Sequence, residues 1–137
     1  MIVTFDPAGR AVVVPVIVAG PTRPFRFHFA LDTGASHTSM RATFLEYLGF
    51  NPAAATKRKR FRSATGTAVV PVLDVSRIIA LGQTRLAFPV AAHDPPPGVT
   101  ADGLLGLDFF RGRVLTLDFA RGRASLSPPR RWWQFWR

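Results

Sequence analysis

The chain has 137 residues, 47% of them hydrophobic, and eighteen Lys and Arg against eight Asp and Glu give it a formal net charge of +10. This length suits one domain with a single packed core, and the hydrophobic content is that of a globular protein rather than a disordered one. The absence of cysteine excludes disulfides and thiolate chemistry, the three widely spaced histidines argue against a metal site, and the positive charge favours acidic partners.

The apolar run over residues 11–19 is predicted to be a β-strand rather than a signal peptide or a membrane span. Asp6 precedes this run and Pro15 interrupts it, whereas a helix that crosses a bilayer needs about 20 apolar residues. We therefore expect a soluble, cytoplasmic protein.

Short strands separated by Gly- and Pro-bearing turns open the chain. The first two are expected at residues 2–5 and 10–18, with a turn at Asp6-Pro7-Ala8-Gly9 between them. Pro15 places the second of these strands at a sheet edge or a bulge. The third strand is expected at residues 25–31, where one parity is apolar, as a strand with one buried face requires: Phe25, Phe27, Phe29 and Leu31.

A short helix and a long hairpin follow. Residues 42–48 place three apolar side chains on one helical face: Phe44, Leu45 and Leu48. Gly49 suits the position just after the end of this helix. Further on, Thr65-Gly66 is predicted to turn a strand at residues 57–62 back into a strand at residues 67–81.

The last part of the chain is again rich in strands. Residues 85–92 are a predicted strand with three apolar side chains on one side: Leu86, Phe88 and Val90. A short helix is expected at residues 107–110, and two final strands at residues 114–119 and 124–126. Short strands at near-regular spacing are typical of all-β domains, so the predicted fold is a mostly antiparallel β-barrel with two short helices.

An acid stands in a tight turn directly after the third strand, in the motif Leu31-Asp32-Thr33-Gly34-Ala35. A second glycine motif, Leu104-Leu105-Gly106, precedes the short helix near the end of the chain. In this order and spacing the two motifs resemble the retropepsin-like aspartic proteases, with Thr65-Gly66-Thr67 at the place of the glycine-bearing flap tip. The resemblance covers about residues 2–127.

This resemblance implies a fold and a domain organisation. The fold would be an all-β, closed antiparallel barrel with a flap hairpin and one or two short helices, assembled as a homodimer. The protease domain would cover residues 1–127, and residues 128–137, which have no counterpart in the family pattern, would form a basic aromatic tail. Besides this tail, the chain departs from the family pattern at Ser36. Viral members often carry another Asp at this position, which helps to hold the substrate backbone.

The chemistry of such a protease needs two carboxylates that share one proton, so that one activates a water while the other donates to the peptide carbonyl oxygen. The sequence offers one Asp in a suitable turn. Asp102 and Asp108 flank the second glycine motif and are the strongest rivals, but neither precedes Thr-Gly or Ser-Gly. We therefore expect the second acid to be Asp32 of another copy, in a twofold homodimer that hydrolyses a protein or peptide substrate without a cofactor or a metal.

The resemblance also implies roles for the neighbours of Asp32. The Thr33 hydroxyl would hydrogen-bond across the dimer and fix the spacing of the two acids, and Gly34 would let the substrate backbone approach. Leu104 and Leu105 would pack behind the acid. The catalytic residues are thus expected to be Asp32, Thr33 and Gly34, and the substrate-binding residues Ala35, Ser36, Thr65, Gly66 and Thr67.

Two features leave alternatives. Residues 57–62 carry five positive charges in six positions, and we favour a solvated strand face over a nucleic-acid surface because few aromatic residues are interleaved for base stacking. If this strand flanks the substrate-binding cleft, it would favour acidic peptides.

The alternative to a protease is a non-catalytic dimerisation or binding module on the same fold, with a basic nucleic-acid-binding face.

The tail contains Trp132, Trp133, Phe135 and Trp136 together with arginines. Such a segment resembles an interfacial membrane anchor, which would give a peripheral membrane contact. Packing on its own domain or on the dimer partner explains the same composition equally well, so both interpretations stay open.

Overall fold

A computed structural model of the chain describes residues 1–63 and 66–131, with the backbone alone at residues 62 and 63. In this part of the chain the strands are β1 (Ile2–Thr4), β2 (Val13–Ala19), β3 (Pro24–Leu31), β4 (Ser39–Met40), β5 (Lys57–Ser63), β6 (Gly66–Ala80), β7 (Gln83–Ala92), β8 (Gly103–Leu105), β9 (Val114–Asp118) and β10 (Arg123–Ser127). The helices are α1 (Ala42–Tyr47), α2 (Leu107–Phe110) and the 3₁₀ turn η1 (Pro52–Ala54). Thr65, a predicted substrate-binding residue, and residues 132–137 of the predicted tail lie outside the described residues.

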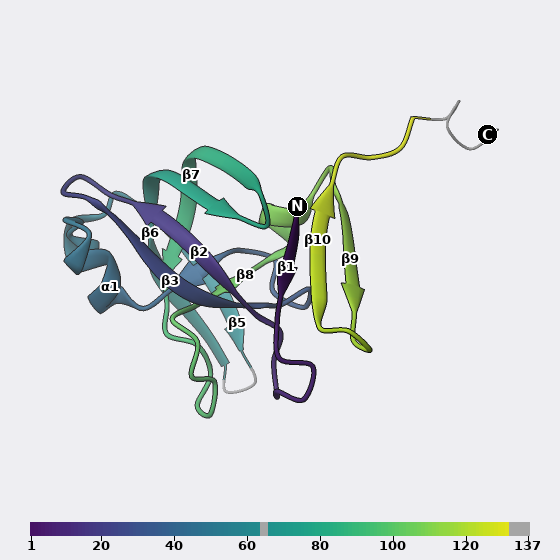
Figure 1. Ribbon diagram of the computed structural model, residues 1–137. Coiled ribbons are helices and arrows are strands. Elements are labelled where there is room, and N and C mark those ends of the chain that lie inside the picture. Colours follow the sequence, from purple (N-terminus) through teal and green to yellow (C-terminus); the bar gives the residue numbers. More distant parts are fainter. Residues whose placement is uncertain (64–65, 132–137) are drawn as a thin grey trace.

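Six strands close into a barrel (Figure 1). Across the described residues the hydrogen-bonded order is β2-β3-β8-β4-β7-β6, β6 returns to pair with β2, and β5 extends the sheet beyond β6. The predicted all-β barrel, mostly antiparallel with short helices, is confirmed. Two pairings, β3 with β8 and β4 with β7, are parallel. The sequence pattern did not show β4 and β8 as strands, because two or three residues are too few for a period to appear.

A separate sheet lies beside the barrel, with β10 between β1 and β9 (Figure 1). In the described part of the chain, β1 and β9 each keep one edge without a strand partner. Ile2 on β1 and Val114 on β9 are exposed. Open strand edges with apolar side chains are surfaces on which a further chain can add a strand.

The barrel interior holds the strand that leads to Asp32. Phe27 and Phe29 of β3 are buried and His28 between them is exposed, as predicted, but the prediction is wrong for Phe25, which is 44% exposed at the start of the strand. Phe29 belongs to the same core cluster as Leu105 of β8 and Phe109 of α2, and all three are fully buried. Burying a side chain of this size contributes about 1.5–3 kcal/mol, so the end of β3 is held by packing against both elements.

The strand with the internal proline is shorter than predicted, since β2 begins at Val13 rather than at residue 10. Pro15 pairs with His28 of β3, but the pairing of β2 with β6 starts only at Val16. Pro15 therefore lies where one side of β2 has no neighbouring strand. No strand on that side needs a hydrogen bond from residue 15, so a proline, which has no N–H, is tolerated there.

The prediction that three apolar residues of β7 share one face is wrong for Leu86. Phe88 and Val90 are buried, but Leu86 is 72% exposed. Ala87 has a φ of 47°, and a left-handed residue inside a strand breaks the period-two alternation. The pairing register with β6 is the same on both sides of Ala87, from Val75↔Phe88 to Arg77↔Leu86, so only the direction of the side chains changes there.

Three connections extend from the same end of the barrel in Figure 1: the β1–β2 loop, the β5–β6 hairpin and the β7–β8 loop. The hairpin pairs from Lys57↔Val72 to Ser63↔Gly66, and it is the element that we predicted as the flap. Gly66 has a φ of 135°, a conformation that favours glycine at the start of β6. Among the described helices, none has the length and apolar character needed to cross a membrane.

Candidate active site

The site is built around Asp32, the first residue after β3. The N–H of Asp32 donates to the carbonyl of Leu105 at 2.9 Å, and the N–H of Leu31 donates to the carbonyl of Val12 at 2.8 Å. The Asp32 Oδ1 atom accepts the N–H of Gly34 at 2.9 Å, which closes a tight turn on the carboxylate itself. A backbone bond from Ala35 N–H to the Asp32 carbonyl, at 3.1 Å, completes this turn.

The second glycine motif supports the segment of residues 32–38, here called the Asp32 loop. The N–H of Leu107, at the start of α2, donates to the carbonyl of Ala35 at 2.8 Å. A Cβ at Gly106 would lie 2.6 Å from the carbonyl carbon of His37 and 2.9 Å from the Ala35 oxygen, so only glycine permits this approach. The predicted packing of Leu105 behind the acid agrees with its full burial, whereas Leu104 is half-buried.

A buried hydroxyl joins the two motifs. Thr38 is fully buried, and its Oγ1 donates to Asp108 Oδ1 at 2.7 Å while it accepts the N–H of Gly106 at 3.1 Å. The N–H of Thr38 donates to the same Asp108 oxygen at 2.9 Å. Among the described residues, Asp108 Oδ2 is buried without a hydrogen-bond partner. Asp108 therefore fixes the far end of the Asp32 loop.

The second rival acid is also bound by backbone. Asp102 Oδ2 accepts the N–H of His28 at 2.8 Å, and the N–H of Asp102 donates to the His28 carbonyl at 2.8 Å. These two bonds continue the pairing of β3 with β8. Asp102 and Asp108 thus have structural partners in this chain, and neither lies in a turn like that of Asp32.

The predicted site residues from Asp32 to Ser36 lie on the Asp32 loop. Asp32 and Ala35 are half-buried, whereas Thr33, Gly34 and Ser36 are exposed. On the predicted flap, Gly66 and Thr67 are exposed at the start of β6. The acid is therefore anchored from behind, and the front of its turn is open to another molecule.

Strand β5 of the flap lies against the Asp32 loop. Lys59 Nζ is 3.5 Å from His37 Nδ1, and the ring of Phe61 lies 6.1 Å from the ring of His37 and 5.1 Å from that of His93. Lys59, Phe61 and His37 are half-buried, but Arg58 and Arg60 are exposed. The basic strand is thus solvated on one side, as predicted, and it meets the site on the other side.

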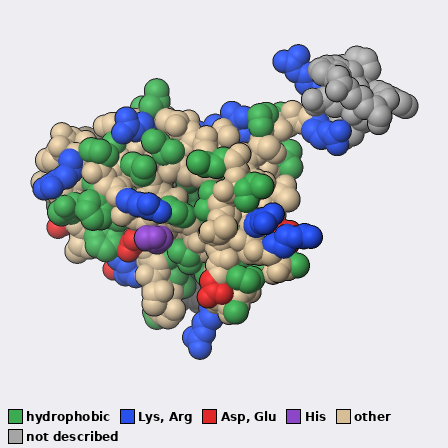
Figure 2. All heavy atoms as spheres, in the orientation of Figure 1, with side chains coloured by type: hydrophobic (Ala, Val, Ile, Leu, Met, Phe, Trp, Pro, Cys, Tyr) green, Lys and Arg blue, Asp and Glu red, His purple; other side chains and the backbone are tan. Residues whose placement is uncertain are grey.

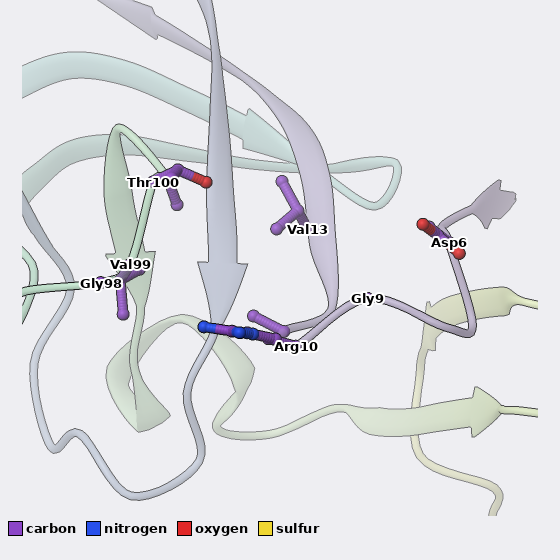
Figure 3. Close-up of a pocket in the computed structure, with 9 residues that line it drawn as sticks. Asp6, Gly9, Arg10, Val13, Gly98, Val99 and Thr100 are labelled. Atoms are coloured by element: carbon purple, nitrogen blue, oxygen red, sulfur yellow. The ribbon is translucent and has the colours of Figure 1, made fainter.

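A pocket of about 430 Å³ lies next to the start of β2 (Figure 3). It is formed by the β1–β2 loop with the start of β2 and by the segment before β8, and its lining comprises Asp6, Gly9, Arg10, Ala11, Val13, Gly98, Val99, Thr100 and Ala101. The arginine side chain extends toward Gly98 and Val99 in Figure 3, while Asp6 lies at the other side of the view.

Sequence reasoning missed three contributors to this site: the Thr38–Asp108 pair and Arg10. The sequence could have indicated a structural role for Asp108, because it is the second residue of the short helix after Gly106. Acids near a helix start often accept backbone N–H groups. Nothing in the sequence indicates that Arg10 lines a pocket, since this depends on the β7–β8 loop that lies across from it. The described residues contain no group of three or more acidic or imidazole side chains that could hold a metal.

Comparison with protein families gives a match to the family described as aspartyl protease, over residues 14–109. The match covers more than half of the chain and includes both the Asp32 loop and Leu104-Leu105-Gly106. The chain belongs to the aspartyl protease family. Comparison with curated protein sequences gives no match.

This aspartyl protease family member is similar in fold to a solved retropepsin-like structure. The crystal structure of a retropepsin-like aspartic protease from Rickettsia conorii is similar to it, with a TM-score of 0.66 and 16% sequence identity. The similarity covers 92% of this chain and 88% of that one. At this identity the likeness concerns the fold, and it confirms the predicted retropepsin-like barrel.

Proposed function

We propose that the protein is an aspartic endopeptidase that hydrolyses peptide bonds with a water held between the Asp32 carboxylates of two copies. One observation carries this proposal. The Asp32 carboxylate is fixed in a turn whose front, at Thr33 and Gly34, is exposed, whereas Asp102 and Asp108 are engaged by backbone N–H groups of their own chain. Membership of the aspartyl protease family supports the same reaction class.

The reaction proposed for this pair is general acid–base catalysis. One carboxylate takes a proton from water, whose oxygen attacks the peptide carbonyl carbon, while the protonated carboxylic acid donates to the carbonyl oxygen. The tetrahedral intermediate then loses its amine as the C–N bond breaks, and the amine leaves with a proton from the pair. Gly34 would lie against the substrate backbone, and the Thr33 hydroxyl would bond to the partner's turn. Ala35, Ser36 and the flap residues Thr65, Gly66 and Thr67 would contact the substrate.

A homodimer is part of the proposal because the catalytic pair is incomplete in one chain. The open edges of β1 and β9 offer surfaces through which two copies could extend one sheet. We further propose that residues 1–127 form the enzyme domain and residues 128–137 a separate tail.

The first experiment compares the wild type with Asp32→Asn on a mixed peptide library, with cleavage products identified by mass spectrometry. Loss of all cleavage in Asp32→Asn is expected, because an amide cannot share the proton, while the near-equal volume leaves the fold intact. The matched control is Glu46→Gln, which removes an exposed carboxylate from α1, outside the site. Turnover retained by purified Asp32→Asn would refute the assignment, and inactivity of a folded wild type would favour the non-catalytic binding module.

A mixing experiment tests the shared pair. When wild-type chains exchange freely with an equal amount of Asp32→Asn chains, only one dimer in about four retains two Asp32 residues, so activity should fall to about half of that without the variant. Activity that does not change on mixing, despite exchange shown with labelled chains, would mean that one chain carries the whole active site.

A further inference from the structure

In the described part of the chain, two positive side chains without an acidic partner lie near the segment that carries Asp32: Arg10, close to the end of β3, and Lys59, against the Asp32 loop. The first is Arg10 in the pocket between the β1–β2 loop and the β7–β8 loop. The carbonyl of Val12, between two pocket residues, accepts the N–H of Leu31 at 2.8 Å. The pocket therefore adjoins the end of β3, one residue before Asp32.

The Arg10 guanidinium is available to bind an acidic group of another molecule. The ion pairs found among the described residues join Arg41 to Asp94, Lys57 to Asp74 and Arg121 to Asp118, and none of them includes Arg10. The one carboxylate that lines the pocket, Asp6, has its Oδ1 engaged by the N–H of Ala8 at 2.9 Å. In Figure 3 this carboxylate and the guanidinium lie at opposite sides of the pocket.

The second positive group is Lys59 on the flap strand β5. Its ammonium contacts His37 of the Asp32 loop at 3.5 Å, and the ring of Phe61 covers the same region. Asp74 is the nearest acid along the hairpin, but it is already paired with Lys57 at 2.7 Å. Lys59 is half-buried, so water screens its charge less than that of the outward Arg58 and Arg60.

We propose that the active site selects peptides with acidic side chains on both sides of the cleaved bond, one bound at Arg10 and one at Lys59. The inference rests on the proposed proteolytic function and adds a substrate class to it. In the pocket, the methylenes of a Glu side chain would pack against Val13 and Val99, while its carboxylate reaches the Arg10 guanidinium. A twofold dimer would repeat both positive groups, so the preference would hold on either side of the two Asp32 residues.

An acidic peptide suits these groups better than a nucleic acid does. The pocket, of about 430 Å³, is large enough to hold a peptide side chain, part of its lining is apolar, and it adjoins the end of the strand that leads to Asp32. Over the face seen in Figure 2, Lys and Arg side chains are spread apart rather than gathered into one continuous strip of the kind that follows a phosphate backbone.

The experiment uses the most rapidly cleaved peptide from the library and its single Glu→Gln or Asp→Asn analogues. For the wild type, each acidic residue at a selected position should raise kcat/KM about fivefold over its amide analogue, the upper range for a partly exposed ion pair. Arg10→Gln should abolish the preference at one position, and Lys59→Gln that at another. The control is Arg26→Gln, on β3 about 20 Å along the strand from Asp32, which should change neither.

A charge-reversal variant separates specificity from loss of fold. Arg10→Glu should prefer a Lys-containing analogue over the Glu peptide, a gain that a damaged protein cannot show. Equal cleavage of acidic and amide peptides by the wild type, or preferences that persist unchanged in Arg10→Gln and Lys59→Gln, would overturn the inference and leave the protease assignment standing.

Binding to Asp32→Asn distinguishes this failure from failure of the proposed function. If no peptide is cleaved but a labelled Glu peptide still binds Asp32→Asn more tightly than its Gln analogue, and Arg10→Gln removes the difference, acidic-peptide recognition holds while proteolysis fails. If instead a single-stranded oligonucleotide displaces the peptide at lower concentration than the Glu peptide itself, the positive groups serve nucleic acid and the inference is wrong.

Discussion

Thr38→Val tests how the second glycine motif holds the Asp32 loop. The substitution keeps the shape of the side chain but removes the hydroxyl that donates to Asp108 at 2.7 Å and accepts the Gly106 N–H at 3.1 Å. A hydrogen bond to a charged group is worth about 1.5–3 kcal/mol, and a buried N–H left without an acceptor costs about 1–3 kcal/mol. Because the new methyl group gains about 1 kcal/mol from burial, we expect a net loss of about 3 kcal/mol.

The adjacent Ser39 provides the matched control. It is 1% exposed, and in the described part of the chain its Oγ has no hydrogen-bond partner. Ser39→Ala should therefore leave stability unchanged or raise it by up to about 1 kcal/mol, since no bond is lost and an unpaired hydroxyl is removed.

Urea denaturation of both variants measures the difference, and a thermal melt should show Thr38→Val lowered by about 10 °C. Thr38→Ser retains the hydroxyl and should keep most of the stability. A loss below about 1 kcal/mol in Thr38→Val, or an equal loss in Ser39→Ala, would refute the argument that this hydroxyl joins the two motifs.

Three further predictions follow from other parts of the molecule. Gly106→Ala should cost more than about 3 kcal/mol in urea denaturation, because its Cβ would meet backbone of the Asp32 loop at 2.6–2.9 Å. Leu86→Lys should change stability by less than about 0.5 kcal/mol, since the side chain is 72% exposed although its position in the pattern is apolar. The N–H of Arg121 holds the pKa of Asp118 below its usual value, so Asp118→Asn should destabilise the protein near neutral pH, with a difference that vanishes as the pH falls through the lowered pKa.

Much of the fold could be predicted because, in long segments, the spacing of apolar residues shows which face of a strand or helix is buried. The helix at Leu107–Phe110 and the hairpin that starts at Lys57 were predicted nearly to the residue. The failures have local causes. Leu86 departs from its pattern because Ala87 adopts a positive φ. An alanine gives no sign of such a backbone conformation in the spacing of apolar residues along the sequence.

The candidate site was predictable where a motif defines it and not where distant segments meet. Asp32 and its neighbours are consecutive, so the motif alone located them. Thr38 and Asp108 are 70 residues apart, and their pairing depends on how α2 is placed under the Asp32 loop. Arg10 became a candidate for substrate recognition only when the fold brought the β7–β8 loop across from it.

The parallel pairing of β3 with β8 has a consequence for how the protein is made. The N–H of His28 reaches a carboxylate 74 residues further along the chain, whereas the β5–β6 hairpin closes within a few residues. Contacts of high sequence separation form late, because the entropy of closing a long loop must first be overcome. During synthesis at about 5–20 residues per second, the Asp32 loop would lack its hydrogen bonds to Leu107 and Asp108 until those residues have been synthesised.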